Sequence, residues 1–300
     1  MFKTLQFPII AAPMAGITDE PFRRILRKLN PDMPIETEMI SCHSITQKHK
    51  PSDKRDRNSD TYFGDNIGAQ IFGADPKLMA EAAKILEQNG AAWIDLNMGC
   101  PVPKVATRAG AGAFLMRDHK LAGEIMAAVV HAVKIPVSVK TRLGWDEQHI
   151  NVSDLVKVAE NSGINFITVH ARTRSQGYSG KARWTEIPKS KLPVIFNGDI
   201  KTTVDIESAK KLGANGAMIG RALMGNPWLF NKDTVGRAET ILEHLDLTLE
   251  YYGNSGVQLF RKHAAWYAVG RPGVAQFRGQ VNQITDATEM KKVISEFFVL

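Results

Sequence analysis

The strongest constraint on the fold of this 300-residue chain is a regular alternation of two sequence patterns. Eight short apolar or β-branched runs begin at residues 9, 35, 67, 92, 136, 166, 193 and 216. Helix-like segments lie between most of them, most clearly over 76–90, 120–133, 152–163 and 203–213, and several end at a glycine, as helices often do. Buried strands that alternate with helices eight times predict a closed α/β structure, the (β/α)8 TIM barrel.

The alternative fold is an open doubly wound sheet. That fold favours a GxGxxG turn after the first strand, but no such turn follows residues 9–13, and GAGAF at 110–114 has only two of the glycines and follows no strand. After about residue 235 the pattern changes to helices without intervening strands. We therefore predict two domains, a catalytic barrel over residues 1–234 and an all-helical domain over residues 235–300.

Composition is ordinary for a soluble globular protein, since 44% of the residues are hydrophobic and 23% are charged. The only cysteines, Cys42 and Cys100, have no paired spacing that indicates a disulfide framework or a zinc site. The first residues lack the pattern of a signal peptide, and no apolar run approaches the roughly 20 residues of a membrane span. We expect a cytoplasmic, monomeric protein without a metal site.

The charge of the chain favours an acidic partner such as nucleic acid. The net charge is +7, and residues 231–300 hold equal numbers of basic and acidic side chains, so the whole surplus lies in residues 1–230. Its densest parts are 98–117 and 171–191. A mildly basic enzyme without such a partner remains the alternative.

In barrels of this kind the chemistry lies at the C-terminal ends of the strands. The residues at these ends are Pro13, Met14, Glu38, Gln70, Asn97, Cys100, Lys140, His170, Asn197, Asp199, Gly220 and Arg221. Each alone is a weak signal: His170 is explained as well by a satisfied core histidine, and Gln70 by a strand cap. Lys140 ends the apolar strand VSVK, where an unpaired ammonium is costly, so we expect an anion beside it, such as the N1 and C2 carbonyl region of a reduced flavin.

Two turns predict a phosphate site. NGDI at 197–200 and IGRA at 219–222 follow the seventh and eighth strands, where barrels often bind phosphate. Gly198 and Gly220 would let a phosphate oxygen approach the backbone, and Arg221 would pair with it.

The segment DLNMGCPVPK at 95–104 leaves the fifth strand in a defined shape, since glycine permits unusual φ angles and proline fixes φ. A loop of defined conformation that presents the Cys100 thiol suggests a chemical role for this residue. From its spacing alone, however, a buried structural thiol is about as well supported.

The motifs of the chain resemble those of the tRNA-dihydrouridine synthases, a family of FMN-dependent barrels. The matching segments, in order, are APMAGITDEPFR (12–23), DLNMGCPVPKV (95–105), VSVKTRLGW (137–145), HARTRSQGYSG (170–180), NGD (197–199), IGR (219–221) and RKHAAWY (261–267). The resemblance covers nearly the whole chain, and its most specific part is NMGCP.

The resemblance implies reduction of the C5–C6 bond of uridines in tRNA, with NADPH as the electron source. It implies that FMN is held by Pro13, Met14, Ala15, Gln70, Lys140, His170, Asn197, Gly198, Asp199, Gly220 and Arg221. Cys100 falls on the catalytic cysteine of the family, where it would act as the general acid that protonates C5. Asn97 would hydrogen-bond the uracil.

A base inside folded RNA must be turned out before it can meet a flavin, and this requires contacts to the RNA backbone. The candidates for these contacts are Lys104, Arg108, Arg172 and Arg174 near the barrel mouth, and Arg261 and Lys262 in the helical domain. Two other functions remain open: a small-molecule pyrimidine oxidoreductase resembling dihydroorotate dehydrogenase, and an RNA-binding protein that helps tRNA to fold.

Overall fold

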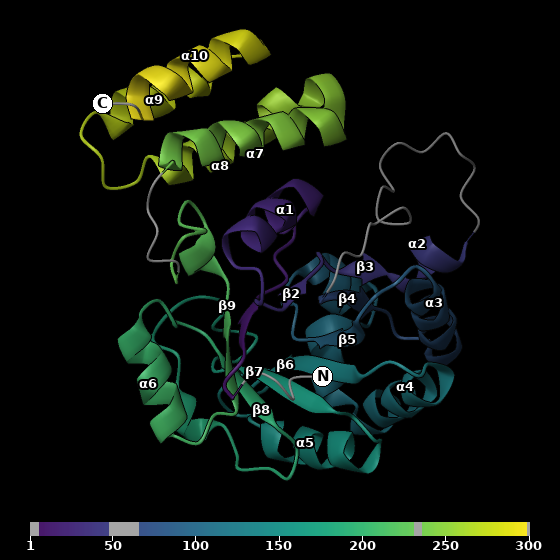
Figure 1. Cartoon of the computed structure of the whole chain (residues 1–300). Helices are drawn as coiled ribbons and strands as arrows, with labels where there is room; N and C mark the ends of the chain where they lie inside the picture. The colour runs from purple at the N-terminus through teal and green to yellow at the C-terminus, as the bar shows by residue number, and fades with distance from the viewer. Residues whose placement is uncertain (1–5, 48–65, 231–235, 299–300) are drawn as a thin grey trace. The chain divides into compact units, whose positions relative to one another are not determined.

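The computed structural model describes residues 6–47, 66–230 and 236–298 (Figure 1). Contacts within the chain divide it into two compact units, Met1–Ala15 with Pro34–Ile219, and Gly16–Met33 with Gly220–Leu300. The predicted domain boundary between residues 234 and 235 lies outside the described residues. In the described part of the chain, no helix combines the length and apolarity that crossing a lipid bilayer requires.

The first unit is built on parallel strands that close into a ring. The strands are β1 (Ile9–Ala11), β2 (Ile35–Glu36), β3 (Ile40–Ser41), β4 (Ile67–Phe72), β5 (Trp93–Met98), β6 (Val137–Arg142), β7 (Phe166–His170), β8 (Val194–Asn197) and β9 (Gly216–Ile219). β2 pairs with both β1 and β4, and the order β1–β9–β8–β7–β6–β5–β4 completes a ring of eight strands. β3 pairs with β4 alone, outside the ring. The predicted TIM barrel and its eight strand positions are thus confirmed.

Helices connect most of the strands. They are α2 (Cys42–Thr46), α3 (Pro76–Gln88), α4 (His119–Ala132), α5 (Val152–Asn161) and α6 (Thr203–Lys211), with the short non-α helices η2 (Lys104–Arg108), η3 (Gly112–Arg117) and η4 (Trp184–Glu186). The four helices predicted most clearly are α3 to α6. The predicted repetition fails after β7, where residues 171–193 hold only η4. Gly177 and Gly180 adopt positive φ there, at 57° and 69°, which a continuous helix excludes.

Local sequence signals set the starts of these helices. Asp75 accepts hydrogen bonds from the backbone N–H groups of Lys77 and Leu78, at 2.8 and 3.0 Å, and Pro76 occupies the first helical position of α3. At the start of α6, Thr202 and Asp205 form a reciprocal capping box.

Trp93 fills the centre of the barrel. Its side chain is fully buried and packs with Ile10, Ala12, Phe166, Ile195 and Met218, which come from β1, β7, β8 and β9 or follow them directly. Its neighbour in register on β4 is Gly68, and a Cβ atom at Gly68 would lie 2.0 to 2.5 Å from three ring atoms of the indole. The absence of a side chain at Gly68 in β4 therefore leaves the space that the indole occupies.

The second unit is helical. It contains α1 (Glu20–Leu29), η5 (Arg221–Leu223), α7 (Arg237–Tyr252), η6 (Gly253–Ser255), α8 (Gly256–Tyr267), α9 (Val274–Val281) and α10 (Ala287–Phe298), which confirms the predicted helices after residue 235. α1, close to the N-terminus, belongs to this unit, because Phe22 packs on the rings of His244 and His263 at 5.5 and 5.6 Å. Burial lowers the pKa of His244 to about 3, and its Nδ1 lies 3.0 Å from the hydroxyl of Tyr267.

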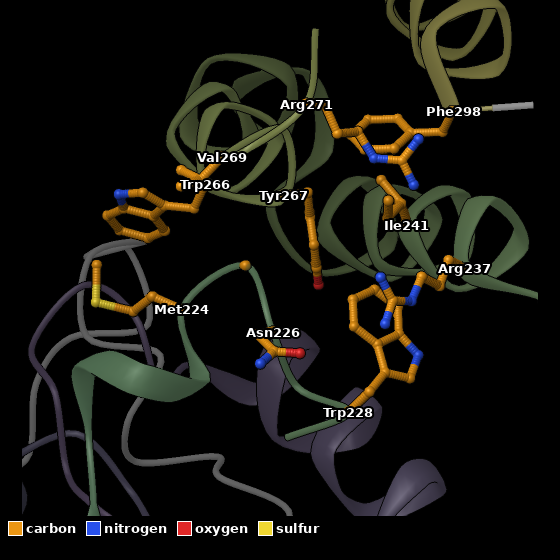
Figure 2. A pocket seen from close by; sticks show the side chains of 11 residues that line it. Met224, Asn226, Trp228, Arg237, Ile241, Trp266, Tyr267, Val269, Arg271 and Phe298 are labelled. Atoms are coloured by element: carbon orange, nitrogen blue, oxygen red, sulfur yellow. The ribbon is translucent and has the colours of Figure 1, made fainter. Parts of the chain in front are cut away.

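A cavity of about 350 Å³ lies within the second unit (Figure 2). Its lining includes Trp228, Arg237, Tyr267, Arg271 and Phe298. The guanidinium of Arg237 lies 5.3 Å from the ring centre of Trp228, and that of Arg271 lies 4.8 Å from the ring of Phe298. Both arginines are therefore held on aromatic faces at this cavity.

Substitution of Gly68 by alanine tests the packing of the barrel centre. We expect Gly68→Ala to lower the free energy of unfolding by about 1–3 kcal/mol or more, because the added methyl group overlaps a fully buried indole that has no space to move into. Urea unfolding followed by circular dichroism measures the change. Gly279→Ala in α9 is the control, since open space surrounds that position and alanine favours helix; equal effects of the two substitutions would contradict the packing.

Candidate active site

Three side chains on one face of β5 form successive layers of the barrel interior. Trp93, Asp95 and Asn97 alternate with outward residues, and each layer lies roughly 6–7 Å nearer the C-terminal end than the one before. In register, Asp95 stands between Gln70 of β4 and Ser138 of β6, and Asn97 stands beside Lys140. The structure therefore brings together Gln70, Asn97 and Lys140, as the sequence predicted for residues at the strand ends.

A chain of hydrogen bonds runs from the barrel interior to Cys100. The carboxylate of Asp95 accepts from the Ser138 hydroxyl at 2.6 Å and from the Gln70 side-chain amide at 2.8 Å. The Gln70 carbonyl oxygen accepts from Asn97 Nδ2 at 2.7 Å, and Asn97 Oδ1 accepts from the backbone N–H of Cys100 at 2.9 Å. Because a carboxylate only accepts, Asp95 fixes the orientation of both amides along the chain.

Two buried carboxyl groups lie in this interior. Burial raises the pKa of Asp95 to about 6, against the hydrogen bonds from Ser138 and Gln70, which lower it. Burial, reinforced by the nearby Asp95, raises the pKa of Glu36 well above its usual value. Among the described residues neither oxygen of Glu36 forms a hydrogen bond of ordinary geometry, and the nearby Trp93 indole and Lys140 only partly oppose the effect of burial, which fits a neutral carboxylic acid.

Lys140 is a partly buried cation with unused donors. Its ammonium donates to Asn197 Oδ1 at 3.2 Å, the one hydrogen bond of that group to the described part of the chain. Burial, followed by the charge of Arg142, lowers the pKa of Lys140 to about 8, and Glu36 and Asp95 oppose this shift. The anion beside this ammonium stays a prediction, which the unused donors of Lys140 are suited to meet.

The Cys100 loop is fixed from several sides. Arg142 is buried, and its Nε donates to the carbonyl of Gly99 at 2.8 Å, while Ala113 N–H donates to the carbonyl of Cys100 at 3.1 Å. A Cβ atom at Gly99 would lie 3.2 to 3.4 Å from the backbone of Lys140 and Thr141, so this loop lies directly against β6. The thiol is partly exposed, and burial raises its pKa, so it stays protonated at neutral pH.

The turn after β8 has a strained backbone. Gly198 and Asp199 adopt positive φ, at 104° and 56°, the second in a residue that rarely does so. A Cβ atom at Gly198 would lie 3.3 Å from the ring of His170. The turn is held by Arg172, whose Nη2 donates to Asp199 at 2.5 Å, and by Trp184, whose Nε1 donates to the carbonyl of Gly198 at 2.9 Å.

The burial of Arg172 does not support the predicted contact with RNA. Its side chain is 1% exposed, and its guanidinium donates to Asp199 and to the carbonyls of Ser179 and Gly180. One further nitrogen lies 3.3 Å from Nε2 of His170, which is itself buried. Arg172 therefore shapes the loop after β7 and the turn after β8.

The other predicted residues are placed as follows. Pro13, Met14 and Ala15 follow β1 and are partly or fully exposed, and Lys104 is exposed in η2. The side chain of Arg108 lies outside the described part of the structure. Gly220 and Arg221 follow β9 in sequence and belong to the second unit. In that unit, Arg261 donates twice to the carbonyl of Ile284, and Lys262 donates to the carbonyl of Gly16.

Sequence reasoning missed Glu36, Asp95, Ser138 and Arg142. A signal for them was present: each is a polar strand residue two positions from a residue already noted at a strand end, Glu38, Asn97 or Lys140. Even spacing places such residues on the face that points into the barrel, where polar groups are kept for binding or for holding other polar groups.

The donor set fits a flavin at this end of the barrel. Lys140 offers spare donors in a partly buried position, and Gly198 leaves room where a Cβ atom would crowd His170. Cys100 supplies a protonated thiol beside them. No group of three or more His, Cys, Asp or Glu side chains suited to a metal occurs among the residues that the structure describes.

Known proteins resemble this chain over its length. The family model described as dihydrouridine synthase matches residues 9–299. A probable tRNA-dihydrouridine synthase of Rickettsia conorii is 40% identical over 97% of this chain and 93% of that protein. tRNA-dihydrouridine synthase B of Pseudomonas putida is 38% identical over 98% of this chain and 92% of that protein. The structure of histamine dehydrogenase from Rhizobium sp. 4-9 matches 81% of this chain with 49% of its own chain, at a TM-score of 0.56 and 14% identity. This is a likeness of fold alone.

Asp95→Asn tests the buried carboxylate through the pH dependence of stability. The folded protein holds the Asp95 proton up to a pKa of about 6, whereas the unfolded chain releases it near 3.8, so this group lowers stability as the pH rises from about 4 to 6. The amide of asparagine does not titrate, so Asp95→Asn should reduce this loss. Urea unfolding at several pH values measures it. Asp154→Asn, at an exposed position of α5, is the control. If the stability of both variants depended on pH in the same way, the raised pKa of Asp95 would be contradicted.

Proposed function

The chain belongs to the dihydrouridine synthase family, as its motifs predicted, and from this membership we propose that it reduces the C5–C6 bond of uridines in tRNA. We propose FMN as its bound cofactor and NADPH as the electron donor. The observation that supports the proposal most strongly is the position of Cys100, whose loop lies against β6 at Gly99 and whose protonated thiol is near enough to the partly buried Lys140 for each group to influence the pKa of the other.

The residues that would hold FMN lie at the ends of several strands or follow them. They are Pro13, Met14, Ala15, Gln70, Lys140, His170, Asn197, Gly198, Asp199, Gly220 and Arg221. Lys140 would bind the negative charge of the reduced ring system, since its ammonium has donors to spare. Gly198 and its strained turn would admit phosphate to backbone N–H groups.

The chemistry requires a hydride at C6 of the uracil, which a reduced flavin supplies when bound, and a proton at C5. Cys100 would donate that proton from its thiol, and the resulting thiolate would recover a proton from solvent. Burial favours this role because it keeps the thiol protonated until the acceptor carbon gains charge. The fixed loop favours it because a general acid must lie within hydrogen-bond reach of its target.

The role of Asn97 changes when its contacts are considered. The prediction is a hydrogen bond to the uracil, but Nδ2 of Asn97 is used by Gln70, and Oδ1 is used by the N–H groups of Gly99 and Cys100. We propose that Asn97 serves first to position the thiol. A hydrogen bond from Asn97 to the base would then use the donor or acceptor sites of the amide that these bonds leave free. The orientation of that amide is set by Asp95 through Gln70.

Reduction of a uridine within tRNA requires that the base leave its stack and that the backbone be held beside the barrel mouth. The charge surplus of residues 1–230 supports this requirement. Lys104 and Arg174 remain the predicted contacts at this mouth, and Arg261 and Lys262 remain predicted contacts of the helical unit.

Replacement of Cys100 by alanine tests the general acid. Cys100→Ala should retain FMN and tRNA binding but lose turnover by roughly 10²- to 10⁴-fold, the usual contribution of a positioned acid. Single-turnover oxidation of reduced enzyme by tRNA transcript measures the decrease. Cys42→Ala is the matched control, since Cys42 is buried beside Gly73, and it should keep the rate of the parent enzyme.

Three results would reject parts of this proposal. Turnover in Cys100→Ala equal to that of the parent would remove the role of the thiol. Purified protein that binds no FMN would remove the cofactor. Cells without the protein that keep every dihydrouridine in their tRNA would remove the activity itself.

A further inference from the structure

Three side chains at the mouth of the first unit form a cationic cluster, of which only Arg174 is among the contacts with RNA that the sequence predicts. Arg117 ends η3, Trp145 follows β6, and Arg174 follows β7. The guanidinium carbons of Arg117 and Arg174 lie 5.0 and 4.4 Å from the ring centre of Trp145. We call these residues the Arg117–Trp145–Arg174 cluster. Two positively charged guanidinium groups thus lie over a single indole.

The cluster has a rigid support. Arg174 N–H donates to the carbonyl of Gly144 at 2.8 Å, and Ser175 N–H donates to the carbonyl of Trp145 at 2.9 Å, so the two loops are joined along their backbones. Phe114 meets the Trp145 ring edge-on, at 6.3 Å and 87°. Arg174 is therefore fixed through its backbone, and the exposed Arg117 is placed by its contacts with the rings of Phe114 and Trp145.

The charges of the cluster are not balanced by the described protein. Neither Arg117 nor Arg174 forms an ion pair within residues 6–47, 66–230 and 236–298, and Nε of Arg174 is buried without an acceptor there. The acidic neighbours have other partners, because Asp146 binds His149 and Glu147 binds Arg183. Two like charges on one ring repel each other, and an anion between or beside them would remove that cost.

The cluster is joined to the Cys100 loop. η3, which ends in Arg117, begins at Gly112, where a Cβ atom would lie 3.1 and 3.2 Å from the carbonyl oxygen and the Cβ of Cys100. The next residue, Ala113, donates its N–H to the same carbonyl. An anion bound to the cluster would therefore be held at a fixed position relative to the thiol.

We propose that Arg117 and Arg174, held on Trp145, bind backbone phosphate of the RNA substrate next to the nucleotide that is reduced. This inference rests on the proposed function. Guanidinium groups match phosphate in a two-pronged geometry, and contacts of this kind position RNA without reading its sequence. Both guanidinium groups lie over the Trp145 ring, so we assign the indole the role of supporting them.

The phosphates of a dinucleotide reductant share this chemistry, and they are the competing occupant. RNA is favoured by the attachment of η3 to the Cys100 loop, because a substrate must be registered against the acid that protonates it. It is favoured also by the density of positive charge over 98–117 and 171–191, which includes both arginines.

The test is the salt dependence of tRNA binding by the flavin-loaded double variant Arg117→Gln/Arg174→Gln. The slope of log K against log salt, measured by filter binding of tRNA transcript over about 50–200 mM salt, should become shallower by roughly 0.7–0.9 for each phosphate that the variant no longer neutralises. KM for tRNA should rise, and turnover should recover at saturating tRNA. Lys84→Gln/Lys211→Gln removes the same charge from exposed helix positions elsewhere in the unit and should leave the slope unchanged.

A second variant separates the ring from the charges. Trp145→Leu keeps both arginines but removes their support, so it should weaken tRNA binding with little change in slope. Retained flavin absorbance and circular dichroism show that each variant is folded.

The alternatives give different results. An unchanged slope in Arg117→Gln/Arg174→Gln would overturn the proposal, as would absence of salt-dependent tRNA binding by the parent protein, or a rise in KM for NADPH with tRNA binding intact. If the parent protein binds tRNA through the cluster but does not reduce uridine, the proposed function is rejected and the phosphate site is supported. If the parent reduces uridine and the double variant binds tRNA normally, only the phosphate site at the Arg117–Trp145–Arg174 cluster is rejected.

Discussion

Closure of the parallel ring at β2 is the constraint on which the site depends. β2 has two residues, and its pairings are Ala11 with Ile35 on one side and Ile35 with Ile67 and Glu36 with Gly68 on the other. Only when these few pairs close the sheet do the strand ends face a common space, so that side chains from β4, β5, β6, β7 and β8 can meet. The short strand thereby controls the convergence of residues that are more than a hundred positions apart in sequence.

Within the closed ring, one carboxylate organises the polar interior. A carboxylate accepts hydrogen bonds and donates none, so Asp95 determines which end of the Gln70 amide faces it, and Gln70 then determines the orientation of Asn97. Orientation is thus transmitted over three side chains to the backbone of Cys100. Burial of these groups makes each misplaced amide costly, which keeps the arrangement unique.

The barrel was predictable from the sequence because its signals are local. Alternation of apolar runs and helical segments gave all eight ring strands, and Cys100, Lys140 and the turn at Gly198 were found because each breaks a local pattern. Asp95 and Arg142 were not predicted, since their roles depend on partners in another strand or in the loops after β5 and β7, and the sequence of one strand does not identify those partners.

Arg172 illustrates the opposite error. Its sequence environment is basic and loop-like, which favoured a contact with RNA, whereas the fold surrounds it with carbonyl oxygens and Asp199. The membership of α1 in the helical unit was also not predicted, because only contacts such as that of Phe22 with His244 reveal it. Local sequence records which residues are charged or apolar, but the pairing of distant segments decides what these residues do.

The indole of Trp93 sets how deep any ligand can enter from the mouth. It closes the bore of the barrel one layer below Asp95 and two layers below Asn97, and the missing side chain at Gly68 lets it lie flat against the wall. Any ligand that enters from the mouth therefore stops above Trp93, and the side chains that it can reach are those of the Asp95 and Asn97 layers and of the loops beyond them.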